Sequence, residues 1–272
     1  MPVNVIYLPI SENFTSEDKA LMCFVPQNRA ERIERFRRDS DRRTSLYATL
    51  LVTMYLRLHC NIPADRLHFE RTPDGKPYTP GLPVRFSCSH TDGAVLAAFS
   101  TLDETGCDVE LIADPPYQIS SIAFSQNERD ALDQCGASEE SLPAGGSSTH
   151  FRKFTTGEEL ATGELSSLVR SFTAEKDLPA DGLPCSRPAI DPEERRALTF
   201  YTIWTRKESY LKYLGTGLAG DITKTDVCSP AISERFISKR ISSHMCSVFN
   251  SADEPVNFTT MDESDVRSFF IG

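Results

Sequence analysis

Two acidic residues, Asp108 and Glu110, alternate with apolar residues in a short segment of the chain. This period of two is typical of a β-strand, so both carboxylates are expected to leave the same face of the strand. Carboxylates this close repel each other unless a cation lies between them. A third acid, Glu208, would complete an all-oxygen site of the kind that Mg²⁺ prefers. The alternative for the pair alone is an acidic strand edge that discourages aggregation.

Glu208 lies in residues 200–214, which contain neither proline nor glycine and are followed by Gly215. This composition predicts a helix that begins after Pro192 and ends at the glycine. Glu208 and Lys212 are four residues apart, so they share one face of that helix. Taken alone, such a pair is more often a feature of a solvated helix surface.

Two segments upstream could bind a phosphate. Lys76 ends a turn rich in proline and glycine, and Ser89 and His90 lie in a predicted loop between strands at 84–88 and 94–100. A lysine and a Ser-His pair can hold a phosphate through charge and directed hydrogen-bond donors. Each also has a simpler explanation, which is solvation of the turn for Lys76 and a hydrogen bond within the loop for His90.

The composition of the 272 residues, 39% hydrophobic and 25% charged, is that of an ordinary globular protein with room for one large or two small domains. A net charge of -10 argues against nucleic acid as the main partner. Residues 29–43 nevertheless contain seven arginines. Such a local basic patch suits a small phosphorylated ligand, or else forms a salt-bridged helix surface.

The amino terminus lacks a basic segment followed by a long apolar core, so no signal peptide is expected. No apolar run approaches the length of a membrane helix, so no membrane association is expected. The eight cysteines are scattered and form no CxxC pair. They are predicted to be free thiols in a reducing cytosol, so no structural zinc site is expected.

Hydrophobic periodicity predicts a mixture of helices and strands. A long core helix is expected to start near Asp41, and residues 136–192 have the composition of a loop-rich insertion with a helix at 158–171. Residues 221–272 alternate apolar and polar side chains, which favours antiparallel strands. Further strands are expected at 3–8, 67–70, 84–88, 94–100 and 107–111.

Taken in order, these segments resemble the Sfp-type 4′-phosphopantetheinyl transferases. That family shows a GKP turn, an FNxSHS-like segment, a G-[IVC]-D-[IV]-E strand and a W-x-x-K-E-x-x-x-K helix. Each motif is short, but their joint order and spacing make a specific pattern that covers most of residues 29–217. The chain departs from it at Ser87 and Thr91, and in a long span between Glu128 and Trp204. The motifs stand here as Gly75-Lys76-Pro77, Phe86-Ser87-Cys88-Ser89-His90-Thr91, Gly106-Cys107-Asp108-Val109-Glu110 and Trp204-Thr205-Arg206-Lys207-Glu208-Ser209-Tyr210-Leu211-Lys212.

The resemblance implies transfer of the phosphopantetheine arm of coenzyme A to a serine of an apo carrier protein, with release of adenosine 3′,5′-bisphosphate. A pyrophosphate near three carboxylates would be repelled, so a divalent ion must bridge them, while basic side chains neutralise the leaving phosphate. Whether Glu208 is a metal ligand, the general base or both stays open. The resemblance assigns Asp108, Glu110 and Glu208 to the Mg²⁺ site, Glu208, Lys212 and Asp108 to catalysis, and Arg43, Lys76, Ser89, His90 and Lys212 to coenzyme A.

The family resemblance also supplies an architecture. It implies an α/β protein of two similar halves, residues 1–104 on the coenzyme A side and 105–272 with the metal site and the principal helix. Each half would be a small, mostly antiparallel sheet packed on a long helix, with the active site between them. We expect a cytoplasmic monomer that modifies acyl or peptidyl carriers. The alternatives are a non-catalytic coenzyme A- or carrier-binding protein of the same fold and, more remotely, a metal-dependent phosphohydrolase.

Overall fold

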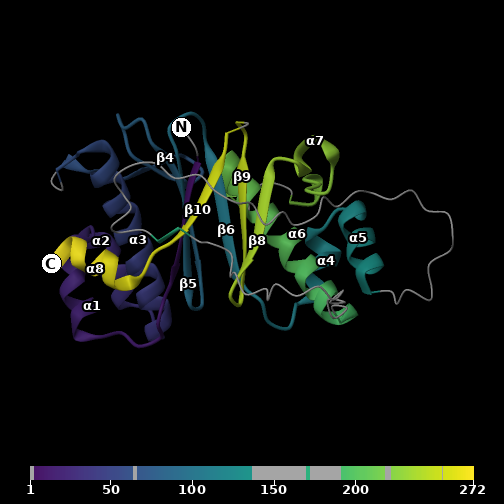
Figure 1. Cartoon of the computed structure of the whole chain (residues 1–272), viewed down its shortest axis with the longest axis horizontal. Helices are drawn as coiled ribbons and strands as arrows, with labels where there is room; N and C mark the ends of the chain where they lie inside the picture. Colours follow the sequence, from purple (N-terminus) through teal and green to yellow (C-terminus); the bar gives the residue numbers. More distant parts are fainter. Residues whose placement is uncertain (1–2, 64–65, 137–169, 172–190, 218–221, 253) are drawn as a thin grey trace, which may run out of the picture.

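The computed structural model describes residues 3–63, 66–136, 170–171, 191–217, 222–252 and 254–272. Within these residues, two β-sheets pack face to face, and helices cover the outer face of each sheet (Figure 1). This arrangement confirms the predicted α/β class, with two halves that are each a small, mostly antiparallel sheet packed on a long helix.

The first sheet has five strands in the order β4-β5-β1-β10-β7. Strands β1 and β10 pair in parallel, and the other neighbours pair antiparallel. Helices α1, α2, α3 and α8 supply the apolar side chains that cover its outer face. The strands are β4 Arg85–Thr91, β5 Ala94–Ser100, β1 Val3–Pro9, β10 Val256–Thr260 and β7 Arg170–Ser171, and the helices are α1 Ser16–Leu21, α2 Gln27–Glu34, α3 Asp39–Cys60 and α8 Glu263–Ile271.

The second sheet has three antiparallel strands in the order β6-β9-β8. Helix α6 lies along its outer face together with α5 and shorter helices (Figure 1). A separate two-stranded ribbon, β2 and β3, flanks the turn that precedes Lys76. The bounds are β6 Thr105–Leu111, β9 His244–Asn250, β8 Phe236–Ile241, β2 Glu70–Arg71, β3 Pro77–Tyr78, α4 Ser120–Ala123, α5 Gln126–Gly136, α6 Pro192–Leu214 and α7 Pro230–Ser233.

Alternation along the strands decides which side chains enter which layer. In β1, Val5 and Tyr7 pack between the two sheets, whereas Ile6 and Leu8 pack with the helices on the outer face. In β6, Cys107 and Val109 likewise pack between the sheets. The predicted alternation of residues 107–111 is therefore confirmed, and it turns Asp108 and Glu110 toward helix α6.

Helix α6 has clear signals at both ends. The side chain of Asp191 accepts a hydrogen bond from the backbone N–H of Glu194 at 3.3 Å, and the helix stops at Gly215, whose φ is 76°. The predicted glycine stop is confirmed. The helix also passes very close to β6, because a Cβ atom at Gly106 would lie 1.8 Å from the carbonyl oxygen of Ser209. Glycine at this position lets α6 approach the strand that carries the acidic pair.

Two local predictions in the first half are wrong. Ser89 and His90 belong to strand β4 rather than to a loop, because β4 continues to Thr91 and pairs with β5 up to the turn at Asp92 and Gly93. The strand predicted at 67–70 is present only from Glu70, where β2 begins. In both cases the pairing partner, rather than local propensity, sets where the strand begins and ends.

The carboxyl-terminal part differs from the sequence expectation in two further ways. Residues 263–271 form helix α8, and β10 pairs in parallel with β1, whereas antiparallel strands were expected over 221–272. Most of the insertion predicted at 136–192 lies outside the described residues. Arg170–Ser171, predicted to end a helix, instead form strand β7 on β10. The domain boundary at residue 104 stays a prediction, and β10 and α8 join the sheet and helices of the first half.

The described part of the chain bears on two other expectations. No helix in it combines the length and apolar character needed to cross a membrane. All seven cysteines in it, which exclude Cys185, carry free thiols, as predicted.

Candidate active site

The carboxylate of Asp108 joins three elements that are far apart in the chain. It is 2% exposed on β6, and its Oδ1 accepts hydrogen bonds from Ser89 Oγ on β4 at 2.7 Å and from Lys212 Nζ on α6 at 2.6 Å. Lys212 Nζ also donates to Ser89 Oγ at 2.7 Å. The structure thus brings together three of the predicted site residues. The side chain of Lys212 in this ion pair is 30% exposed.

The other carboxylate oxygen of Asp108, Oδ2, is buried and has no hydrogen-bond partner among the described residues. Burial and the charge of Asp108 together raise the pKa of Glu110 to about 7. The same two causes raise the pKa of Glu208. Asp108 therefore disfavours the charged form of both glutamates, and a cation bound beside it would offset this effect.

Lys212 offsets part of this repulsion. Burial disfavours its ammonium form, but the adjacent carboxylate of Asp108 outweighs that effect and raises the pKa of Lys212. The side chain is therefore charged at pH 7. A fixed positive charge held by an acid is suited to neutralise an anion that approaches the cluster.

Glu110 is held from both halves of the molecule. Thr91 Oγ1 on β4 donates to its Oε2 at 3.3 Å, and the indole of Trp204 on α6 lies beside it and favours its charged form. Both partners are neutral, so they orient the carboxylate without cancelling its charge.

The residues fit a magnesium ion in part. Among the described residues, no group of three or more His, Cys, Asp or Glu side chains is arranged as a complete metal site. Mg²⁺, however, commonly takes only one or two carboxylates and completes its shell with waters and substrate phosphates. The buried, unpartnered Oδ2 of Asp108 is an oxygen donor of that kind. The assignment of Asp108, Glu110 and Glu208 as metal ligands stays a prediction that this donor set supports.

A basic flank lies beside His90. Strand alternation places His90 on the face of β4 opposite Ser89, toward α2 and α3. Burial of the ring, together with the positive charges of Arg29 and Lys212, lowers the pKa of His90 to about 4, although the residue keeps an exposed edge. Its imidazole is therefore neutral at pH 7 and can donate one N–H. The charge of Arg32 acts in the same direction with a smaller effect.

The structure places Lys76 away from the hydrogen bonds of the acidic cluster. Its Nζ donates to Glu104 at 2.6 Å and to the backbone carbonyl of Tyr213 at 3.1 Å. This position at the last turn of α6 satisfies a helix carbonyl and matches the helix dipole. The coenzyme A contact predicted for Lys76 stays a prediction, and it would have to compete with these partners.

Arg43 lies in a different buried network. Its guanidinium, 2% exposed, donates to Glu263 at 2.9 Å and lies 3.3 Å from a carboxylate oxygen of Asp18. It also donates to Ser11 Oγ and to the carbonyl oxygen of Asn13. These contacts tie α3 to α1 and α8 and engage the arginine on several sides. The structure does not bring Arg43 into contact with Asp108.

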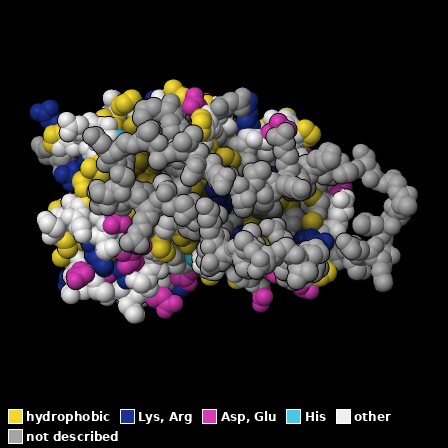
Figure 2. Space-filling model, viewed as in Figure 1, with side chains coloured by type: hydrophobic (Ala, Val, Ile, Leu, Met, Phe, Trp, Pro, Cys, Tyr) yellow, Lys and Arg dark blue, Asp and Glu magenta, His cyan; other side chains and the backbone are white. Residues whose placement is uncertain are grey.

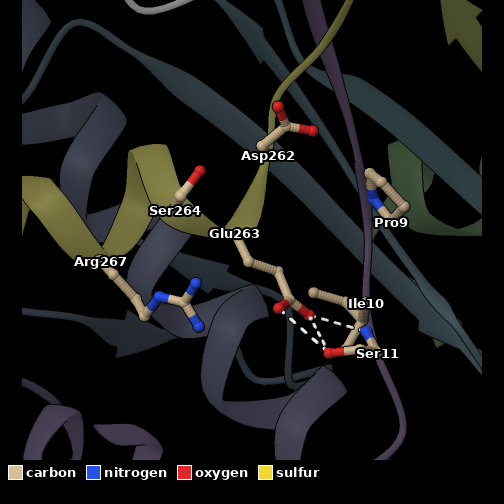
Figure 3. Close-up of a pocket in the computed structure, with 7 residues that line it drawn as sticks. All are labelled: Pro9, Ile10, Ser11, Asp262, Glu263, Ser264 and Arg267. Carbon is tan, nitrogen blue, oxygen red and sulfur yellow. Dashed lines mark hydrogen bonds between the residues drawn. The ribbon is translucent and has the colours of Figure 1, made fainter.

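Next to this network is an open pocket of about 420 Å³, at the start of α8 (Figure 3). In it the carboxylate of Glu263 accepts hydrogen bonds from the backbone and side chain of Ser11, with Arg267 nearby. On the face shown in Figure 2, acidic and basic side chains are mixed over this region. The pocket is lined by none of the predicted site residues.

Sequence reasoning missed a buried ion pair next to the site. Lys207 and Glu128 are both fully buried, with Nζ and Oε2 2.8 Å apart. Lys207 lies between two other charged residues, Arg206 and Glu208, so the sequence does not show which of the three is buried. A lysine is rarely buried unless it is paired. The pair fastens α6 to α5 and thereby fixes the helix that carries Glu208.

Comparisons with known proteins give matches to 4′-phosphopantetheinyl transferases on both sides of the segment that carries Asp108 and Glu110. A family model described as "4′-phosphopantetheinyl transferase, N-terminal" matches residues 9–101, and one described as "4′-phosphopantetheinyl transferase superfamily" matches residues 172–259. A 4′-phosphopantetheinyl transferase, pptA, of Paxillus involutus is 26% identical over 211 residues, which are 74% of this chain and 63% of the relative. In Bacillus subtilis, the 4′-phosphopantetheinyl transferase ffp is 30% identical and Sfp of strain 168 is 27% identical, each over 131 residues, or 47% of this chain and 57% of the relative. The chain thus matches less than two thirds of the length of these relatives.

Proposed function

The chain belongs to the Sfp-type 4′-phosphopantetheinyl transferase family, and we propose that it transfers the 4′-phosphopantetheine arm of coenzyme A to a serine of an apo carrier protein. The observation that carries the proposal is the buried Asp108. It receives hydrogen bonds from Ser89 and Lys212 and keeps one oxygen without a partner. Three family motifs thus meet at a single carboxylate.

In the proposed reaction, the serine oxygen of the carrier bonds to the phosphorus that bears the pantetheine arm. The bond from that phosphorus to the bridging oxygen of the pyrophosphate breaks, and adenosine 3′,5′-bisphosphate leaves. The serine proton goes to a base, for which Glu208 is our candidate. Burial and Asp108 raise the pKa of Glu208, and a higher pKa makes a carboxylate a stronger base.

A bound Mg²⁺ would supply positive charge against the pyrophosphate, and Asp108 Oδ2 with Glu110 or Glu208 would hold it. Lys212 keeps its charge because Asp108 is adjacent, so it is placed to neutralise the leaving phosphate. Ser89, which bonds both of these residues, orients them relative to each other.

Coenzyme A carries further phosphate groups, and the basic flank beside His90 is suited to them. Arg29 is half-buried and held by a 3.2 Å hydrogen bond from its Nε to Thr49 Oγ1. Within the described part of the chain its terminal nitrogens have no hydrogen-bond partner, so they can take a ligand. Neutral His90 can donate a directed hydrogen bond, and Arg32 is exposed nearby. We propose these three residues as phosphate contacts, with Lys76 joining them only if it leaves Glu104.

The net charge of -10 sets a condition on carrier docking. Carrier proteins usually present an acidic helix, so docking has to depend on a local basic or apolar patch rather than on overall charge. The expected cytoplasmic monomer stays part of this proposal, and the free cysteines support a reducing compartment.

The test is to incubate the purified chain with coenzyme A, Mg²⁺ and a panel of apo fatty acid, polyketide and peptide carriers, and then to weigh the carriers. We expect one phosphopantetheine mass to be added to at least one carrier, and none when the metal is removed with EDTA. A folded protein that adds no mass to any carrier would refute the transferase. Coenzyme A binding without turnover would then favour the non-catalytic alternative.

A further inference from the structure

Strands β4 and β6 belong to different sheets, yet they lie against each other along a seam that side-chain hydroxyls bridge. Three hydroxyl residues at spacing two share one face of β4. Ser87 Oγ accepts from the backbone N–H of Cys107 at 3.0 Å, Ser89 Oγ donates to Asp108 at 2.7 Å, and Thr91 Oγ1 donates to Glu110 at 3.3 Å. The hydroxyls therefore join the two sheets at three successive points.

The three contacts differ in what they hold. Ser87 satisfies a buried backbone amide, so its contact belongs to the packing of the two sheets. Ser89 holds Asp108 in the cluster described above. Thr91 donates to the carboxylate of Glu110, which has no ion pair in the described part of the chain. The negative charge of Asp108 repels this carboxylate.

Without a donor at residue 91, Glu110 would keep only the indole of Trp204 beside it and would be less restrained from turning away from Asp108, because rotation relieves the repulsion between two carboxylates. A neutral hydroxyl opposes that rotation and brings no positive charge that would compete with a cation. Threonine is suited to this task, since its branched Cβ restricts χ1 and fixes the direction of the hydroxyl on a strand.

We propose that Thr91 is a positioning residue that orients Glu110 for a divalent cation. The inference rests on the proposed function, to which that cation belongs. Thr91 itself touches neither the substrate nor the metal in this proposal. It acts through Glu110, in the way that hydrogen-bond partners behind a metal ligand set the ligand's direction.

The experiment titrates Mn²⁺ alone into the full chain and follows the free ion by electron paramagnetic resonance. Thr91→Val keeps the shape of the side chain and removes the hydroxyl. We expect it to weaken Mn²⁺ binding about 10-fold, the low end of the range for such partners. Thr91→Ser, which restores the hydroxyl, should return the affinity to within about 3-fold of the wild type, since the remaining difference is the freedom of χ1.

Ser87→Ala is the matched control, because it removes a hydroxyl from the same seam without touching a carboxylate. We expect it to lower the stability to urea but to leave Mn²⁺ affinity unchanged. Equal Mn²⁺ affinity in Thr91→Val and the wild type would overturn the inference. An equal loss of affinity in Ser87→Ala would also overturn it, because the seam would then act only as structure. A wild-type chain that binds no Mn²⁺ would instead overturn the metal site of the proposed function, and the role of Thr91 with it.

Discussion

Replacing Lys207 with methionine should destabilise the fold strongly. The ammonium group is fully buried, 2.8 Å from the equally buried carboxylate of Glu128. It also donates to the backbone carbonyls of Ile222, at 2.9 Å, and of Thr225. Methionine has a similar volume but no donor. The substitution therefore leaves a buried carboxylate without its counter-charge and two carbonyls without this donor.

The magnitude follows from these contacts. Removal of one partner from a buried ion pair costs about 3–5 kcal/mol. Glu128 retains two backbone donors, the N–H groups of Val227 at 2.8 Å and Ser125 at 2.7 Å. Burial also raises its pKa, so it can take up a proton when Lys207 is gone. Both effects favour the lower end, about 3 kcal/mol, or a melting temperature lower by roughly 6–12 °C at about 2–4 °C per kcal/mol.

Urea unfolding followed by circular dichroism measures this loss directly. A Lys207→Met chain within about 1 kcal/mol of the wild type would refute the reasoning, since the expected loss is about three times larger. The double change Lys207→Met with Glu128→Leu tests the cause. Replacing both partners of a buried pair with apolar residues is often close to neutral, so the double variant should recover most of the stability.

Three further predictions concern the site. Glu208→Gln should abolish transfer in the carrier mass assay while unfolding in urea like the wild type. Asp108→Asn should lose both transfer and stability, because it breaks the ion pair with Lys212. The pKa of Glu110 is about 7 in the folded protein, against an ordinary value of 4.5 for a glutamate. Between these two values the folded protein keeps a proton that the unfolded chain releases, so the free energy of unfolding in EDTA should fall as pH rises. Urea titrations of Glu110→Gln should show a smaller fall. Arg29→Ala should raise the KM for coenzyme A several-fold with little change in kcat, unlike Arg38→Ala, whose exposed guanidinium already pairs with Asp92.

The parts of the fold that sequence could predict are those with local causes. The alternation at residues 107–111 and the glycine that ends α6 are properties of neighbouring residues, and both are confirmed. The end of β4 depends instead on pairing with β5, which carries Ser89 and His90 into the strand. The parallel pairing of β10 with β1 joins residues about 250 positions apart, and no local period encodes such a partner.

The same limit applies to the basic residues. Arg29 and Arg43 both lie in the arginine-rich segment, and composition alone cannot separate their roles. The amino-terminal part of α3 lies beside α1 and α8, so Arg43 is enclosed by the carboxylates of Asp18 and Glu263. Arg29 lies on α2 with its charge close to His90. The difference arises from which helix packs where, and this is a tertiary property.

Lys207 and Glu208 are adjacent in helix α6, but the first stabilises the fold and the second belongs to the proposed site. Adjacent residues in a helix point about 100° apart, because a turn takes 3.6 residues. One therefore faces α5, where Lys207 is neutralised by Glu128, and the other faces β6, where Glu208 shares the field of Asp108. The favourable pair fixes the rotation of the helix, and that rotation holds Glu208 near a charge that repels it. A cluster of acids that would separate if the helix could turn is thus kept together by a buried pair on its neighbouring face.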